Sequence, residues 1–334
     1  MVGSYATGLT LRVKRLPSRG ETVLASGYRS DYGGKGSNQA VGCARLGAEV
    51  SFVANIGRDD FAEMARRLYR EEGIDTAFLR QVPNVPTGVG FILVDEAGHN
   101  CIALDPGAND LLSPAEVTES RLAFQKSTVV LTQLETPVET AETALTFGRS
   151  EHAITILNPA PVRELPGSVL QLVDVLTPNQ TEANVLTGRS PDASSDPEQV
   201  AQELIRTGVK QVVMTLGEKG ALIVSSSSSR HVPAPEMRAV DTTGAGDAFN
   251  AGLATALANG EDLESAVRFA VITGALAVTK EGVIPSLPRR QEVTDFLCEH
   301  SQEAPVWLMG NAMSKKPKAL MHERAEDHLG EHTD

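Results

Sequence analysis

Aromatic residues, cysteines and long apolar runs are all scarce in this chain. Only 4% of its 334 residues are aromatic, which argues against a surface that stacks nucleic-acid bases. Cys43, Cys101 and Cys298 are too few and too widely spaced for a disulfide framework or a zinc site, so we expect reduced thiols in the cytoplasm. No apolar run approaches the roughly 20 residues that a membrane span needs, and the N-terminus has no signal-peptide pattern.

Positive charge is also in short supply. The chain has 30 lysines and arginines against 43 aspartates and glutamates, which gives a formal net charge of −13. Such a surface repels a phosphate backbone, because nucleic-acid binding depends mainly on Lys and Arg. We therefore expect neither nucleic acid nor a membrane as a partner, and a nucleotide site would be electropositive only locally. The 41% of hydrophobic residues is ordinary for a globular protein with a full core.

From about residue 48 the chain alternates short β-branched segments with longer amphipathic ones. This pattern is typical of the α/β class, with a mostly parallel central sheet flanked by helices. We expect one such domain over residues 1–300. The expected strands are 50–54, 128–131, 153–157, 173–176 and 211–215. The expected helices are 61–72, 138–148, 182–186 and 197–207, with further helix almost continuously from 247 to 280.

Segments 9–31 and 88–104 instead alternate apolar and polar residues with a period of two. We expect strands of a small β lid, whose apolar face could pair with another subunit. Residues 301–334 are rich in charge and histidine, so we expect a disordered or loosely attached tail. His328 and His332 have the spacing of metal ligands on a helix, but Gly330 between them favours a solvated tail.

The strongest chemical motif is Asp241-Thr242-Thr243-Gly244-Ala245-Gly246-Asp247, which follows an extended run ending at Val240 and opens an apolar helix. A strand, a glycine turn and a helix start form an anion site, because the small residues let the backbone approach a phosphoryl group. Asp247 is placed to accept the proton of an attacking hydroxyl. A lone Asp near a helix start is more often only a cap, but the neighbouring glycines favour the catalytic role.

A second motif, Gly33-Gly34-Lys35-Gly36-Ser37-Asn38, lies between a lid strand and a small-residue helix from Gln39 to Leu46. Its spacing is not that of a Walker A sequence. A glycine-rich turn of this kind is more often structural than functional. Lys35 and Asn38 could nonetheless donate hydrogen bonds to sugar hydroxyls, and the glycines could leave room for a small polar ligand.

Two further motifs follow expected strands. In Thr177-Pro178-Asn179-Gln180-Thr181-Glu182, the side chains of Asn179 and Glu182 share one face and could hold water ligands of Mg²⁺. A helix cap explains the same residues about equally well. Thr215-Leu216-Gly217-Glu218-Lys219-Gly220 could pass under a nucleotide, although alone it could be any hairpin.

With these four motifs in this order, the sequence resembles the ribokinase family, also called the PfkB carbohydrate kinases, over roughly residues 2–298. The resemblance implies an enzyme that transfers the γ-phosphate of ATP to a sugar hydroxymethyl group, with ribose as the best guess. It also implies a β lid that often forms a homodimer interface. A kinase for another small sugar, a polyol or a nucleoside stays open. So does a catalytically silent sugar- or nucleotide-binding relative, although the intact Asp247 argues against it.

By its motifs, the resemblance also assigns roles to individual residues. The catalytic residues are Asp247 as the base and Gly244, Ala245 and Gly246 as the anion hole. The sugar contacts are Gly34, Lys35, Gly36, Ser37, Asn38, Glu135 and Asp247. The ATP contacts are Asn179, Thr215, Leu216, Gly217, Glu218, Lys219, Gly220 and Gly246. Mg²⁺ is held indirectly by Asn179 and Glu182, and K⁺ by Asp241, Thr243, Ala277, Lys280, Gly282 and Ser286.

The N-terminal segment departs from the family pattern. After Gly3-Ser4 the family usually places an Asn and then an Asp that bind ring hydroxyls, but the matching positions here are Ala6 and Gly8. Selection for ring hydroxyls should therefore weaken. Only Met1 and Val2 precede Gly3, so we expect either a late start or a shortened central sheet. The acceptor, the oligomeric state and the role of the tail are left open.

Overall fold

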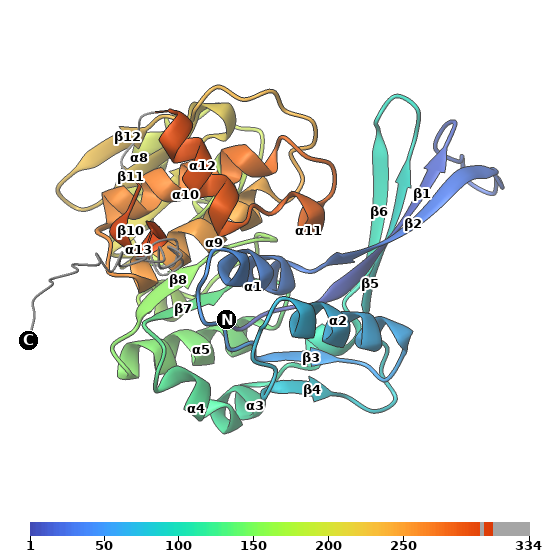
Figure 1. Cartoon of the computed structure of the whole chain (residues 1–334), viewed down its shortest axis with the longest axis horizontal. Coiled ribbons are helices and arrows are strands. Elements are labelled where there is room, and N and C mark those ends of the chain that lie inside the picture. The colour runs from blue at the N-terminus through green and yellow to red at the C-terminus, as the bar shows by residue number, and fades with distance from the viewer. Residues whose placement is uncertain (301–303, 310–334) are drawn as a thin grey trace, which may run out of the picture. The chain divides into compact units, whose positions relative to one another are not determined.

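The structure is a computed structural model that describes residues 1–300 and 304–309 (Figure 1). It divides into two compact units, Met1–Val293 and Thr294–Asp334, and all four motifs lie in the first. The predicted tail lies outside the described residues, except for a short helix, α13 (Val306–Met309). The spacing of His328 and His332 is likewise outside them. Among the described helices, none has the length and apolar character to cross a bilayer.

The central sheet is mostly parallel, as predicted. Its order is β12 (Ser229–Val232), β11 (Ala221–Val224), β10 (Gln211–Thr215), β9 (Val175–Leu176), β8 (Ile154–Leu157) and β7 (Val129–Thr132). Strands β7 to β10 are parallel, and β11 and β12 add an antiparallel edge. Beyond β7, Val2 forms single parallel bridges to Thr132 and Val53, next to the parallel pair β3 (Ala54–Ile56) and β4 (Leu79–Gln81). The sheet is therefore shortened to one residue at the position of Val2.

Helices cover both faces of this sheet. One core includes side chains such as Leu145 and Leu204 against Leu157. Its helices are α5 (Val138–Ser150), α6 (Gly167–Leu170), α7 (Gln180–Leu186) and α8 (Pro197–Arg206). A second core joins Val41 and Ala248 to Ala54. Its helices are α1 (Lys35–Arg45), α2 (Asp60–Glu71), α9 (Ala245–Ala258), α10 (Leu263–Ala277) and α11 (Val283–Ser286). The remaining helices of the described chain are η1 (Gly107–Leu111), α3 (Pro114–Glu119), α4 (Arg121–Phe124), η2 (Gly217–Lys219) and α12 (Arg290–Glu299).

Helix α2 shows how local sequence sets these elements. Asp59 caps the helix, because its Oδ1 atom accepts a hydrogen bond from the Ala62 N–H at 2.9 Å. The buried residues Ala62, Ala65 and Leu68 then recur every three positions on the face that packs into the core. A capped start and an apolar stripe therefore explain the close agreement with the predicted helix 61–72.

The predicted lid forms a separate sheet. Its order is β2 (Ala25–Gly33), β1 (Ala6–Val13), β5 (Gly88–Val94) and β6 (Asn100–Asp105) (Figure 1). Strand β1 is antiparallel to β2 and parallel to β5, and β6 is antiparallel to β5. Phe91, Ile102 and Leu104 remain more than half exposed on these strands. The lid thus carries apolar surface outside the cores.

Two local expectations were wrong. Residues 233–239 form no strand before the Asp241 motif, and β12 ends at Val232. Pro233 and Pro235 explain this break, because proline has no N–H to donate to a strand ladder. Helix α1 begins at Lys35 rather than at Gln39. The second motif therefore supplies the first turn of the helix, and the turn itself is confined to Gly34 with φ of 87°.

Glycine lets α9 pack tightly against the helices on either side. A Cβ atom on Gly42 of α1 would lie 2.6 Å from the Ala251 Cβ atom of α9. A Cβ atom on Gly252 of α9 would lie 2.3 Å from the Thr273 Oγ1 atom of α10. Both distances are too short for a side chain, so the three helices stay in close contact. This packing fixes the start of α9 relative to the start of α1.

Candidate active site

The carboxyl ends of the parallel strands collect polar side chains. In open α/β sheets this edge is where ligands bind. The starts of α1 and α9 meet at the same edge, because the side chains of Asn38 and Asp247 are hydrogen-bonded. The residues that follow the strands are Gln133 and Glu135 after β7, Asn158 after β8, and Thr177 and Asn179 after β9.

Asp247 is buried at the start of α9 and is held by two amides. The preceding Gly244 is the N-cap and has left-handed φ of 83°. Asp247 is 6% exposed, and its Oδ2 atom accepts from Asn38 Nδ2 at 2.8 Å. Its Oδ1 atom accepts from Gln39 Nε2 at 2.9 Å. The two donors therefore fix the orientation of the Asp247 carboxylate at the start of α9.

Glu135 connects the second motif to the end of β7. Its Oε2 atom accepts hydrogen bonds from Ser4 Oγ at 2.6 Å and from the Lys35 backbone N–H at 2.7 Å. Ser4 Oγ also accepts from the Gly36 N–H at 3.3 Å, and the Ser4 carbonyl accepts from the Ser37 N–H at 2.8 Å. Ser37 is fully buried, so the structure does not bring its side chain to the surface of this site.

Lys35 and Glu182 add half-buried charge near Asp247. Burial lowers the pKa of Lys35. The nearby carboxylates of Asp247, Glu135 and Glu182 outweigh burial and leave this pKa above its ordinary value. Burial raises the pKa of Glu182, which the hydrogen bond from Asn179 and the charge of Lys35 offset only in part. The Lys35 ammonium group is therefore a local positive charge in an acidic protein, as a phosphoryl group requires.

The glycines of the two signature motifs meet different surroundings. A Cβ atom on Gly34 would lie 2.7 Å from Ala6 N, and one on Gly36 would lie 2.4 Å from Ser4 N. These two glycines therefore let α1 approach the protein backbone, instead of leaving room for a ligand as we expected. A Cβ atom on Gly246 would meet no atom of the described residues within 4 Å. The first turn of α9 is thus open at Gly246 to an anion.

The turn after β10 also keeps one glycine open. Gly217–Lys219 form a short 3-10 helix, η2, and the Leu216 N–H donates to the Gly220 carbonyl at 2.8 Å. Gly220 has φ of 94°, and a Cβ atom on it would lie 2.1 Å from the Val232 carbonyl oxygen. Gly220 is therefore required by the fold. Gly217, Glu218 and Lys219 are exposed, and the Gly217 backbone has open space beside it.

Asn179 and Glu182 cap the start of helix α7, which was one of the two roles predicted for their motif. Asn179 Oδ1 accepts from the Glu182 N–H at 2.8 Å, and Glu182 Oε2 accepts from the Asn179 N–H at 2.9 Å. The Thr215 N–H donates to the Pro178 carbonyl at 2.9 Å, which places this cap beside the turn after β10. The capping box uses one carboxylate oxygen of Glu182, so it does not exclude a role toward a water-coordinated Mg²⁺.

Asp241 connects two loops that the resemblance assigned to K⁺. Its Oδ1 atom accepts from the Thr243 N–H at 2.9 Å, and its Oδ2 atom accepts from the Gly282 N–H at 3.0 Å. Burial raises the pKa of Asp241, but these hydrogen bonds outweigh burial and leave this pKa below its ordinary value. The loop before α9 and the loop before α11 are therefore joined through one carboxylate.

Of the other residues assigned to K⁺, Ala277 ends α10, Lys280 lies in the loop before α11, and Ser286 ends α11. Several of their groups already have partners. The Ala277 carbonyl accepts from the Lys280 N–H at 3.3 Å, and Ser286 Oγ donates to the Val283 carbonyl at 2.8 Å. The Lys280 ammonium group pairs with Glu292. The described residues contain no group of three or more His, Cys, Asp or Glu side chains that could hold a metal, so a cation here would depend mainly on carbonyl oxygens.

Ala6 and Gly8 lie on β1, where the lid joins the site. The strand register pairs Gly8 with Asp31 of β2 and with Gly90 of β5, so these positions share one face. A Cβ atom on Gly8 would lie 3.6 Å from Ile92 Cδ1 and 3.9 Å from the Asp31 carbonyl oxygen. These are ordinary contacts, so a larger side chain would fit. Neither Ala6 nor Gly8 has a side-chain donor or acceptor.

Two lid arginines reach the loop that Asp241 holds. Arg12 of β1 lies 2.9 Å from a Glu281 carboxylate oxygen, and Arg29 of β2 lies 3.4 Å from the same oxygen. Arg29 also pairs with Asp31 at 2.5 Å. All four side chains are at least 31% exposed, so each ion pair contributes little to stability. The pairs nevertheless connect the lid to the loop beside Gly282.

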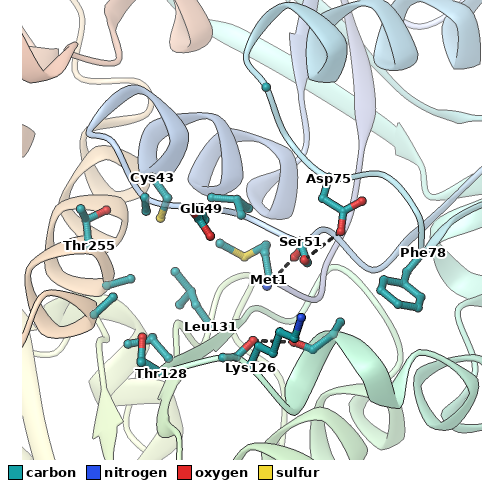
Figure 2. Close-up of a pocket in the computed structure, with 18 of the residues that line it drawn as sticks. Met1, Cys43, Glu49, Ser51, Asp75, Phe78, Lys126, Thr128, Leu131 and Thr255 are labelled. Carbon is teal, nitrogen blue, oxygen red and sulfur yellow. Dashed lines mark hydrogen bonds between the residues drawn. The ribbon is translucent and has the colours of Figure 1, made fainter.

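A cavity of about 970 Å³ lies at the opposite, amino-terminal end of the strands (Figure 2). Met1, Ser51 and Leu131 are among its lining residues, which include none of the predicted site residues. The Met1 amino group donates to the Ser51 carbonyl at 3.0 Å, and burial lowers the pKa of this amine to about 6. The cavity lies where the central sheet is shortened to Val2.

Sequence reasoning missed the amide side chains behind the base. Gln39, Gln133 and Asn158 are buried and are joined by side-chain hydrogen bonds. One signal was available, because Gln133 and Asn158 each come directly after an apolar strand of the expected sheet. Polar residues at that place belong to the ligand-binding edge. Their mutual contact depends on three separate chain segments, so no local pattern could reveal it.

The chain is similar to known carbohydrate kinases. The model of the pfkB family carbohydrate kinases matches residues 1–290. A ribokinase of Haemophilus influenzae is 38% identical over 301 residues, which cover 90% of this chain and 98% of the relative. A deoxyribokinase of Salmonella typhi is 35% identical over 298 residues, with 89% of this chain and 97% of the relative covered.

Solved structures give the same result. A ribokinase of Thermotoga maritima aligns with a TM-score of 0.82 at 36% identity, and the alignment covers 89% of this chain and 98% of the other. An Arabidopsis thaliana ribokinase complexed with ribose and ATP also aligns with a TM-score of 0.82, at 31% identity, with 89% and 97% covered.

These matches identify the class of enzyme as a phosphotransferase with an alcohol group as acceptor. The chain belongs to the pfkB family of carbohydrate kinases. The predicted ribokinase-like fold and the prediction of a sugar kinase are therefore confirmed.

Proposed function

We propose that this kinase transfers the γ-phosphoryl group of ATP to the hydroxymethyl group of a pentose, with Asp247 as the general base. The observation that carries the proposal is the buried Asp247 carboxylate, which two amides hold next to the open backbone of Gly246. The acceptor hydroxyl gives its proton to Asp247 while its oxygen bonds to the γ-phosphorus. The bond from that phosphorus to the bridging oxygen breaks, and its electron pair leaves with ADP.

The phosphoryl group would lie at the start of α9. There the N–H groups of the first helical turn and the open Gly246 backbone offer donors to its oxygens. The Lys35 ammonium group adds a positive charge from α1. The open turn at Gly217 would lie along the rest of the nucleotide. The relative that binds ATP, from Arabidopsis thaliana, supports ATP as the donor.

Mg²⁺ and K⁺ are the cations proposed for this site. Mg²⁺ prefers oxygen ligands and keeps several waters, so one carboxylate such as Glu182 together with the phosphates of ATP would suit it. K⁺ would bind between the loops that Asp241 joins, through carbonyl oxygens. The residues fit both ions, because neither requires a cluster of acidic side chains. When bound, Mg²⁺ neutralises phosphate charge and K⁺ orders the loops beside the anion hole.

Ribose is the first acceptor to test, since relatives at 32–38% identity are named ribokinases. The replacement of two polar anchors by Ala6 and Gly8 favours weaker selection for ring hydroxyls, because a site rejects a substrate that leaves its own polar groups unpaired. Ile92 beside Gly8 makes this part of the lid more apolar. The relative named deoxyribokinase shows that a protein this similar can bear the name of a less hydroxylated sugar.

A coupled ADP-release assay with ribose, 2-deoxyribose and a hexose panel tests the proposal. We expect turnover with a pentose and a ribose preference weaker than that of a typical ribokinase. The double variant Ala6→Asn, Gly8→Asp should raise kcat/KM for ribose relative to 2-deoxyribose. Strong, exclusive use of ribose by the unmodified protein would show that other residues replace the two anchors.

The lid is also the surface proposed to join two copies of the chain. Ile102 and Leu104 are 60% and 54% exposed on one face of the lid, because the register pairs them with Ile92 and Gly90. Phe91, which is paired with Ala103, is 51% exposed on the other face. Burial of Ile102 and Leu104 between two lids would remove them from water. Sedimentation equilibrium should give the mass of a dimer, and Ile102→Ser should shift it toward the monomer. A monomer at all concentrations would exclude this assembly.

A further inference from the structure

Gln39 contacts the proposed base but belongs to no motif with an assigned role. It is fully buried in the first half of α1. Its Nε2 atom donates to Asp247 Oδ1 at 2.9 Å and to Asn158 Oδ1 at 3.0 Å. Its Oε1 atom accepts from Gln133 Nε2 at 2.5 Å. Both amide protons and the carbonyl of Gln39 are thus used by groups from three other chain segments.

These partners fix which way the Gln39 amide points. With the amide reversed, its oxygen would face the oxygens of Asp247 and Asn158, and its NH₂ group would face the NH₂ group of Gln133. All of these contacts would be repulsive in a buried region where water cannot replace them. The Gln133 donor therefore keeps the Gln39 donor directed at the base.

The hydrogen bonds continue from Asn158 back to the start of α9. Asn158 Nδ2 donates to the Thr177 carbonyl at 3.1 Å, and Thr177 Oγ1 donates to Asn250 Oδ1 at 2.6 Å. Asn250 Nδ2 then donates to the Gly246 carbonyl at 2.8 Å. The network therefore forms a closed ring through Asp247 and the residue before it. None of its side chains is more than 7% exposed.

From this ring we infer that Gln39 is the positioning residue of the reaction. It holds one oxygen of Asp247 in place and stabilises the carboxylate form, while Asn38 does the same for the other oxygen. A carboxylate oxygen can accept more than one hydrogen bond, so each keeps room for the acceptor proton. Gln39 itself does not touch the acceptor or ATP. The inference rests on the proposed role of Asp247 and names the residue on which that role depends.

Two substitutions at Gln39 test the inference. Gln39→Met keeps the length and removes the donor, and Gln39→Glu keeps the shape but places a second carboxylate against the base. Lys35 of α1 and Glu182 of α7 also carry charge near Asp247, and neither substitution changes them. A donor to a charged group favours the charged form, so its loss should move the acid limb of the kcat–pH profile to higher pH. We expect kcat at neutral pH to fall roughly 10- to 100-fold in Gln39→Met, from the lost charge-assisted hydrogen bond. The KM for the sugar should change less than about threefold.

The larger shift of the acid limb is expected in Gln39→Glu, because like charges at this distance disfavour each other. The matched control is Gln202→Met. Gln202 is a partly buried amide on α8 that donates to the Ser225 carbonyl at 3.2 Å, outside the site. Its loss should leave the pH profile unchanged even if the melting temperature falls.

The outcomes separate this inference from the proposed function. If Asp247→Asn abolishes turnover but both Gln39 variants keep the wild-type acid limb, Gln39 is only structural and the inference fails. If Asp247→Asn keeps turnover, the base itself is wrong. A shifted limb with a nearly unchanged KM in the folded variants supports the inference. Circular dichroism and melting curves establish which variants are folded.

Discussion

The acceptor side and the nucleotide side of the proposed active site are built in different ways. On the acceptor side, Asn38, Gln39 and Asp247 are each no more than 6% exposed and are joined through their side chains. On the nucleotide side, Gly217 and Gly246 are exposed, and within the described part of the chain no atom lies within 4 Å of a Cβ atom placed on either glycine. One side is complete before a ligand arrives, whereas the other depends on space that side chains leave open.

This difference predicts which kind of substitution should impair each side. A preorganised carboxylate loses function when a donor or its own charge is removed. A backbone cradle loses function when atoms are added, because the ligand must come close to the N–H groups. Substitutions on the two sides should therefore separate into those that remove a group and those that fill a space.

The largest effect is expected from Asp247→Asn. The loss of a general base should lower turnover about 10²- to 10⁴-fold and leave ATP binding intact. The fold should be kept because Asn38 can reverse its amide and accept from the new NH₂ group, since Asn38 Oδ1 has no hydrogen-bond partner among the described residues. Steady-state assays and calorimetric titration with a non-hydrolysable ATP analogue measure the two quantities. Asp60→Asn, at an exposed position on α2, is the control and should behave as wild type. Near wild-type turnover of the purified Asp247→Asn protein would contradict the assignment.

The next largest effect is expected from substitutions at two glycines, Gly246 on the nucleotide side and Gly36 on the acceptor side. Gly246→Ala adds a methyl group where no described atom lies within 4 Å, so the fold should gain about 0.5–1 kcal/mol from helix propensity. Turnover should fall roughly 10- to 100-fold, because a phosphoryl group displaced by an ångström is misaligned.

Gly36→Ala should instead lower the stability of the fold. Its Cβ atom would lie 2.4 Å from Ser4 N, so the backbone must shift, at a cost of about 1–3 kcal/mol. Thermal melts and kcat of both variants test the contrast. Equal loss of stability in both would remove the distinction between a filled and an open glycine.

A smaller effect is expected from the cation loops. Activity should require Mg²⁺ and rise with K⁺ in sodium-free Tris, and Asp241→Asn should abolish the response to K⁺ while leaving basal turnover measurable. Because the folded pKa of Asp241 is lowered, its stabilising contribution is complete above the unfolded value of about 3.9 and is lost as pH falls through the folded value. Melting curves between pH 5 and pH 3 should converge for the two proteins. Identical rates with and without KCl would count against a K⁺ site.

The smallest effect is expected at the ion pairs between the lid and Glu281. Glu281→Gln should change the free energy of unfolding by less than about 1 kcal/mol, because Arg12 and Arg29 are largely exposed. The KM for the acceptor should rise slightly, and high salt should remove the difference from wild type. A large loss of stability would show that these pairs hold the lid in place.

The fold and the motif residues could be predicted because their signals are local. Periodicity predicted β10 with the observed bounds, 211–215. The glycine-rich segments before α1 and α9 could be recognised because each is one continuous stretch of sequence. The strand expected before Asp241 does not form, because two prolines interrupt this segment. The apolar residues around them resembled a strand, but the missing N–H groups prevent one.

The support of the base could not be predicted in the same way. Gln39 is 94 residues from Gln133 and 119 residues from Asn158 in the sequence, yet it forms hydrogen bonds with both. Only the folded sheet brings the ends of β7 and β8 to α1. A buried amide is also indistinguishable in sequence from an exposed one, because burial depends on packing from distant segments. The amide ring therefore became visible only with the structure.

The tight contact between α1 and α9 has a consequence for how this protein could drift in sequence. Gly42 touches no proposed ligand, yet a single added carbon there would meet Ala251 at 2.6 Å and separate the helices that carry Gln39 and Asp247. Natural selection for activity would then also act on Gly42. In a collection of random mutants, inactive proteins should include changes at this glycine, which a search limited to ligand contacts would overlook.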